Sequence, residues 1–70
     1  MANYRTQSHN AELSDGTKLG HDVIAAATVN GKTLAKGQGV VILKEVNADG
    51  SPLQGARQYS FTYGQTITVA

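Results

Sequence analysis

Large apolar side chains are scarce in this chain, and their number limits the core that it can build. Only fifteen of the 70 residues are Val, Ile, Leu or Phe. Ordering a residue costs on the order of 1.5 kcal/mol, which apolar burial in so small a chain barely offsets. Small domains commonly gain the missing stability from disulfides, a metal or oligomerisation. Because the chain has no cysteine, it has neither a disulfide nor a thiolate metal site. The sequence therefore favours self-association or docking onto a larger assembly.

Charged residues are also few. They make up 16% of the chain, against roughly 25% of an average globular domain. Arg57 is the only charged residue from position 50 to the end. An exposed protein surface is normally rich in charge, so we expect partners to cover part of this one. The net charge of +1 does not indicate strong binding to a polyanion.

The first ten residues, MANYRTQSHN, are polar and lack the apolar run of a signal peptide. The sequence also has no apolar stretch long enough for a membrane-spanning helix. We therefore expect no membrane partner, no secretion by a signal peptide, and a location inside the cell or in a virion.

Apolar residues are distributed unevenly along the chain. Residues 1–20 carry few of them in an irregular pattern, with a turn signal at Ser14-Asp15-Gly16 and one short strand predicted over 3–7. We predict that 1–20 form an extended polar N-terminal arm and that 21–70 form a small β domain. An arm of this kind is either disordered or lies across a neighbouring chain, on which it docks through its apolar side chains. Its predicted interface residues are Tyr4, Leu13 and Leu19.

Strand signals dominate the rest of the sequence. The segment 22–31, DVIAAATVNG, fits either a short helix or a strand that runs into a hairpin at Asn30-Gly31, and its length favours the strand. The turn composition of 47–52 separates further predicted strands. These strands cover 32–36, 40–46, 57–63 and 65–69. Short strands joined by turns predict an all-β fold, a five-stranded meander barrel or sandwich.

Tyr59, Phe61 and Tyr63 recur at every second position, which places three of the four aromatic rings on one face of a strand. Half-buried strands need large apolar groups on one face, and this chain has few others. We therefore expect Phe61 to be buried, Tyr59 to be mostly buried, and Tyr63 to lie at a rim or interface. The alternative is a platform on which the bases of a single-stranded nucleic acid stack. Its charges would come from Arg57, Lys32, Lys36 and Lys44.

The serine, histidine and acidic residues of the chain do not form a recognisable catalytic or metal-binding motif. No serine lies in a Gly-x-Ser-x-Gly turn, and Gly37-Gln38-Gly39 leads into a strand instead of the helix that a phosphate-binding loop requires. His9 and Glu12 have a spacing that suits a metal on a helix, but the residues around them disfavour a helix. We expect no enzymatic activity, no cofactor and no metal site.

Residues 36–42, KGQGVVI, resemble the Lys-Gly-aromatic-Gly-aromatic strand of cold-shock domains. Gln38 and Val40 stand where that family has its aromatic residues. Because those rings are what stack on bases, the resemblance does not extend to the family's function.

The sequence therefore favours a non-enzymatic assembly module. We expect a subunit of a homo-oligomer or of a larger particle, such as a decoration or tail accessory protein of a phage virion. Two alternatives stay open. One is a small β-barrel that binds single-stranded nucleic acid, and the other is an inhibitor that pairs an edge strand with its target.

Overall fold

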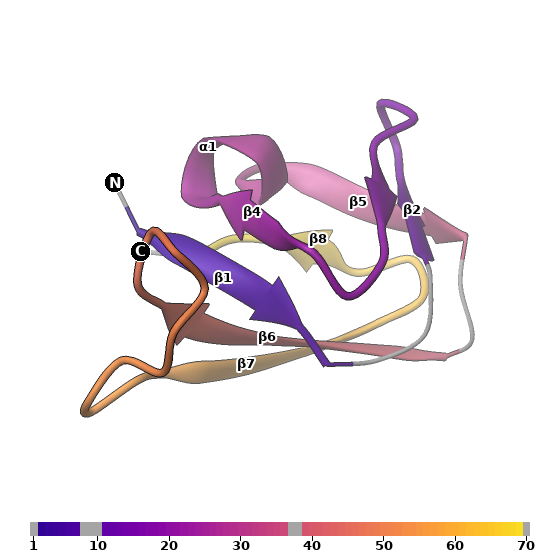
Figure 1. The fold of residues 1–70 in the computed structure, drawn as a ribbon. Coiled ribbons are helices and arrows are strands. Elements are labelled where there is room, and N and C mark those ends of the chain that lie inside the picture. The colour runs from indigo at the N-terminus through magenta and orange to yellow at the C-terminus, as the bar shows by residue number, and fades with distance from the viewer. Residues whose placement is uncertain (1, 8–10, 37–38, 70) are drawn as a thin grey trace.

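The computed structural model describes residues 2–7, 11–36 and 39–69. These residues form mostly β-structure, as the sequence predicts, in two open antiparallel sheets of four strands (Figure 1). The first sheet has the order β4-β1-β6-β7 and the second has the order β3-β2-β5-β8. The elements are β1 (Asn3–Thr6), β2 (Ala11–Leu13), β3 (Lys18–Leu19), β4 (Val23–Ala25), α1 (Ala26–Val29), β5 (Lys32–Lys36), β6 (Val40–Val46), β7 (Gln58–Thr62) and β8 (Thr66–Ile67).

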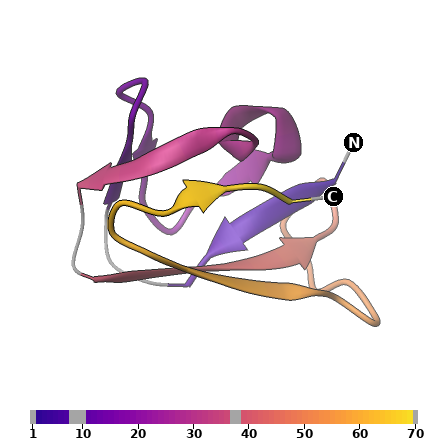
Figure 2. The same cartoon turned by 180° about the vertical axis from the view of Figure 1, so that it is seen from behind.

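One apolar core joins the two sheets, which form two layers in Figure 2. Alternate residues of each strand point into it, because side chains of a strand alternate between its two faces. The first sheet contributes Tyr4, Val41, Leu43 and Phe61, and the second contributes Leu13, Leu19, Leu34 and Ile67. Every one of these side chains is buried, and among the buried apolar residues that the structure describes only Val46 lies outside this cluster.

The predicted N-terminal arm is not confirmed, because residues of 1–20 form β1, β2 and β3 within the two sheets. β1 lies inside the first sheet, where Tyr4 is opposite Ile24 of β4 on one side and Glu45 of β6 on the other. The three predicted docking residues, Tyr4, Leu13 and Leu19, are buried in the core of their own chain. The prediction failed because strands of two to four residues place only one or two side chains in the core. An alternation of apolar and polar residues over so few positions cannot be distinguished from chance in a polar sequence.

The ambiguous segment 22–31 contains both predicted structures in succession. β4 is followed directly by α1, a single helical turn. The hairpin expected at Asn30-Gly31 is wrong, since β4 pairs with β1 in the first sheet while β5 pairs with β2 and β8 in the second. The chain therefore crosses between sheets here. Gly31 has a φ of 76°, a conformation that favours glycine.

The remaining predicted strands are present, but the predicted number of five is wrong for the part of the chain that the structure describes. β5 and β6 match their predicted ranges, whereas β7 and β8 are shorter than predicted. β4 lies within the predicted strand 22–31 but has only three residues, and the additional strands β2 and β3 have three and two residues. Within the described ranges, α1 is the only helix, and its one turn is far too short to span a bilayer.

Candidate interaction surface

The outer edge of β7 has backbone groups that no neighbouring strand uses. Tyr63 N–H donates to Gly39 O at 2.9 Å, and Glu45 N–H donates to Arg57 O at 3.0 Å. Hydrogen-bonded pairs alternate in an antiparallel ladder, so the odd-numbered residues of β7 point their N–H and C=O groups toward β6. The even-numbered residues point these groups away from β6, toward the edge of the sheet.

One of the three even-numbered residues of β7 is satisfied within the chain. Thr62 N–H donates to Gln65 Oε1 at 3.0 Å, and Thr62 O accepts from Gln65 N–H at 2.9 Å. Gln58 and Ser60 have no such partner among the residues that the structure describes. The free stretch of the edge therefore consists of the N–H and C=O groups of Gln58 and Ser60.

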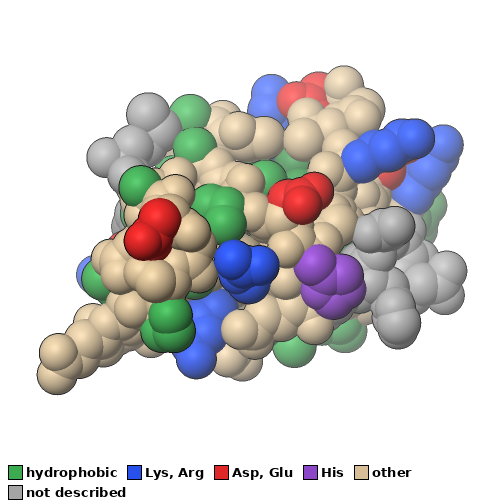
Figure 3. Space-filling model, viewed as in Figure 1, with side chains coloured by type: hydrophobic (Ala, Val, Ile, Leu, Met, Phe, Trp, Pro, Cys, Tyr) green, Lys and Arg blue, Asp and Glu red, His purple; other side chains and the backbone are tan. Residues whose placement is uncertain are grey.

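Uncharged side chains surround this edge on the outer face of the first sheet. Opposite residues on that face are Val40 with Thr62, Ile42 with Ser60, and Lys44 with Gln58. Val40 is 41% exposed, so an apolar side chain stands in solvent beside the edge. The charged side chains visible in Figure 3 are scattered among uncharged ones. Lys44 marks the end of the uncharged part of this face, which comprises Val40, Ile42, Gln58, Ser60 and Thr62.

The inner face of β7 carries the aromatic residues. Phe61 is 6% exposed and stacks with Tyr59 at 6.3 Å between ring centroids, while Tyr4 meets Tyr59 edge-on at 5.9 Å. Burial raises the pKa of Tyr4, and the neighbouring Tyr59 and Glu45 raise it further. Phe61 is buried as predicted, and Tyr59 is half-buried. Tyr63 lies beyond the end of β7 and is 63% exposed.

The residues of the predicted nucleic-acid surface are not brought together. Two of the rings pack in or against the core. Lys32 and Lys36 lie on the other sheet in ion pairs, whereas Lys44 lies on β6 of the first sheet. Lys32 Nζ is 3.3 Å from Asp15 Oδ2, and Lys36 Nζ is 3.4 Å from Glu12 Oε2. Arg57 stays beside β7, where its Nη1 donates to the Tyr59 hydroxyl at 3.4 Å and this bond raises the pKa of Arg57. No row of exposed rings with cations beside it results.

The residues considered for catalysis or metal binding also remain apart. Ser8, His9, Gly37 and Gln38 lie outside the described residues. Ser14 Oγ accepts from Thr33 N–H, and Ser51 Oγ donates to Asp49 Oδ1, so both hydroxyls bond within nearby turns and strands. Across the described ranges, no three His, Cys, Asp or Glu side chains gather as metal ligands do.

Comparison with known protein families, with curated proteins and with solved structures gives no match for this chain. The candidate surface therefore depends on its geometry alone. The free edge of β7 was not predicted from the sequence, although a signal for it is present. QYSFT contains no charge and no proline, and both are common protective features of an edge strand.

Proposed function

We propose that this protein is a non-enzymatic assembly module that joins a second copy of itself through the edge of β7. The observation that carries the proposal is the free hydrogen-bonding pattern of Gln58 and Ser60. An exposed strand edge with unpaired N–H and C=O groups is a template for pairing with another chain. β7 is the longest edge strand, since it has five residues against three in β4 and two each in β3 and β8.

In one antiparallel register, the free N–H and C=O groups of Gln58 and Ser60 in one copy meet those of Ser60 and Gln58 in a second copy. If Gln58 of one copy lies opposite Ser60 of the second copy, each of these residues donates its N–H and accepts at its C=O. The twofold axis then passes between the two copies of Tyr59, which face each other on the inner side. This register leaves the pair between Thr62 and Gln65 intact. It also places no charge against a like charge, because Gln58 and Ser60 are neutral.

Size-exclusion chromatography with light scattering on the isolated chain tests this proposal. We expect a dimer whose fraction grows with concentration. Ser60→Pro removes an N–H that points away from β6, so it abolishes pairing between copies while the ladder to β6 keeps its bonds. Ser60→Thr retains the N–H and serves as the matched control, which we expect to dimerise like the unchanged chain. A monomer at all concentrations, or a Ser60→Pro dimer as stable as the unchanged one, contradicts the proposal.

The same edge also supports edge pairing with a different protein, as in the inhibitor alternative. A chain that is monomeric alone but binds a target protein through β7 would favour that alternative over self-assembly. Membership of a phage virion stays a prediction from composition. No contact within the described residues favours nucleic-acid binding.

A further inference from the structure

A hollow on the outer face of the first sheet lies away from the edge of β7. The loop after β6, drawn in orange in Figure 1, folds back beside β1 and forms one wall of it. The hollow has a volume of about 130 Å³. The hollow is lined by Arg5, Gln7, Lys44, Glu45, Val46, Gly50 and Pro52.

Two positively charged residues on neighbouring strands line this hollow. Arg5 of β1 is directly opposite Lys44 of β6, and like charges at opposite positions of an antiparallel pair repel. The ion pairs among the described residues use Lys32 and Lys36, so neither Arg5 nor Lys44 has a carboxylate within ion-pair distance there. Within the described part of the chain, these two cations therefore have no ion-pair partner.

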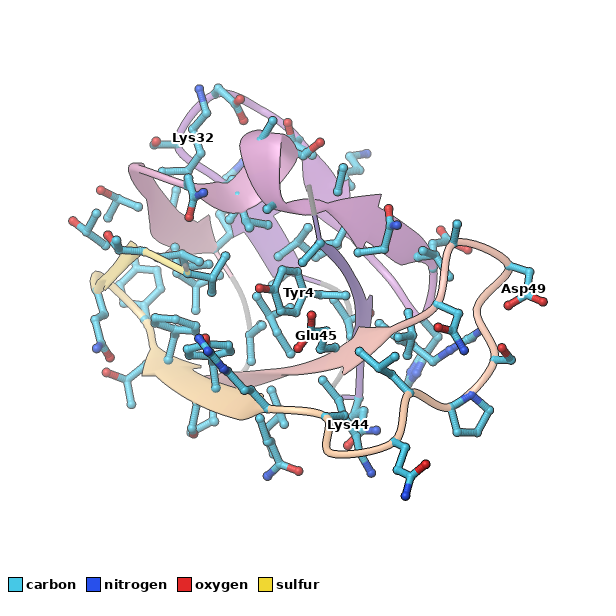
Figure 4. All side chains as sticks on the ribbon, turned by 90° about the vertical axis from the view of Figure 1, so that its left-hand side faces the viewer. Tyr4, Lys32, Lys44, Glu45 and Asp49 are labelled. Carbon is cyan, nitrogen blue, oxygen red and sulfur yellow. The ribbon has the colours of Figure 1, made fainter. Side chains whose placement is uncertain are left out.

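Glu45 also lines the hollow, but among the described residues neither it nor Asp49 forms an ion pair with Arg5 or Lys44. Figure 4 shows Glu45 on the side of β6 that faces Tyr4, opposite to the side from which Lys44 projects. Asp49 accepts hydrogen bonds from the backbone N–H and the hydroxyl of Ser51 at 2.9 and 2.7 Å. These bonds lower the pKa of Asp49 and keep its carboxylate within its own turn.

The guanidinium of Arg5 is held in place by two backbone carbonyls. Nη1 donates to His21 O at 3.2 Å, and Nη2 donates to Gly50 O at 3.3 Å. The other N–H donors of this guanidinium have no partner among the described residues. A side chain at position 50 would collide with the group, since a Cβ there would lie 2.5 Å from Nη2, and the φ of +87° also favours glycine. The cation is therefore positioned before any ligand arrives.

We infer that this hollow binds a small carboxylate that carries a short apolar substituent. A fixed guanidinium with free donors suits a planar carboxylate, and Lys44 adds a second charge. Val46 and Pro52 supply an apolar wall. Phosphate sites usually use several backbone N–H groups, but Gly50 N–H is already donated to Asn47 O at 2.8 Å. The volume is close to that of a cavity of about 150 Å³ that accepts benzene, so a ligand of a few carbon atoms fits in it.

Titration of the ¹⁵N-labelled chain, followed by amide and Arg5 Nε–H shifts in NMR spectra, tests this inference. Butyrate is the probe, and the neutral butyramide is its matched control. We expect saturable shifts at Arg5, Gln7 and Gly50 with butyrate and none with butyramide. Acetyl-valine imitates the C-terminal carboxylate of a peptide. Tighter binding of acetyl-valine than of butyrate would indicate a peptide C-terminus as the ligand, and the reverse order would indicate a free small acid. This inference does not depend on the assembly proposal, because the hollow lies away from the edge of β7. Ser60→Pro should therefore leave the butyrate-induced shifts unchanged.

Two variants locate the site. Lys44→Gln retains much of the aliphatic stem and should weaken butyrate binding about fivefold, as expected for one solvent-exposed charged contact. Lys18→Gln removes a charge from an exposed position on the other sheet and should have no effect. Gly50→Ala displaces the guanidinium and should abolish binding. Equal shifts with butyramide, no effect of Lys44→Gln, or tighter binding of inorganic phosphate than of butyrate would overturn the inference.

Discussion

Phe61 is the residue whose substitution best separates a core role from a binding role. Its ring packs against Tyr59 and lies on the strand position opposite Val41 in the core. Phe61→Ala should lower the free energy of unfolding by about 3–5 kcal/mol, the usual cost of removing a buried ring. Tyr63→Ala is the control, because this exposed side chain should change stability by less than about 0.5 kcal/mol. Urea denaturation measures both, and a stable Phe61→Ala chain would contradict the core assignment.

Asp15 gives the molecule an acid-sensitive contact. The backbone N–H of Thr17 donates to its carboxylate at 3.0 Å, and this bond, followed by the Thr17 side chain and Lys32, lowers the pKa of Asp15 from 3.8 to about 2. A depressed pKa in the folded state means that the contribution is fully present above 3.8 and is lost as the pH falls toward 2. We expect the stability difference between the unchanged chain and Asp15→Asn to shrink over that window.

An NMR titration of the Asp15 side-chain carboxyl checks the same point directly. A midpoint near the ordinary value for aspartate would show that the contact with Thr17 does not form in solution. Thr17 N–H should then also lack protection from hydrogen exchange. This pair of observables separates the hydrogen bond from the ion pair with Lys32, because only the former involves the amide proton.

At the scale of elements, the sequence was most informative where a strand is long or apolar. β6 opens with four consecutive large apolar residues and was predicted with its observed bounds. β7 was found from the alternation of its rings. β1 and β2 were missed as parts of the fold because Tyr4 and Leu13 stand among polar neighbours, and their burial depends on pairing with distant strands. Whether such a short segment becomes a strand depends on its pairing with distant parts of the chain, which a local sequence pattern does not show.

Deletion of β1 tests whether the N-terminal residues are an integral part of the fold. Because β1 lies between β4 and β6, and Tyr4 is 0% exposed, deletion of residues 1–6 should remove cooperative unfolding altogether. Circular dichroism and the dispersion of NMR amide signals measure this loss. Gln7→Ala, at an exposed position just after the strand, is the control and should fold normally. A truncated chain that still folds would restore the interpretation of 1–20 as an arm.

For the whole molecule, both candidate binding regions arise from contacts between distant parts of the sequence. Arg5 and Lys44 become neighbours only through the pairing of β1 with β6. The edge of β7 that stays free is the one opposite the edge that pairs with β6. Composition predicted that the chain needs partners, since it has few core residues and few charges. The location of a partner surface required the sheet order, which the sequence analysis did not contain.

Thermal stability should therefore depend on protein concentration. Dimerisation through β7 stabilises the folded chain by mass action, because the unfolded chain does not pair in this register. Once dimers dominate, a tenfold increase in concentration should raise the Tm by about 3–6 °C for a domain of this size. Ser60→Pro should show a Tm that is independent of concentration, whereas Ser60→Thr should behave like the unchanged chain. Calorimetry over a range of concentrations measures this dependence. A Tm of the unchanged chain that stays constant would show that its stability comes from its own small core and not from dimerisation.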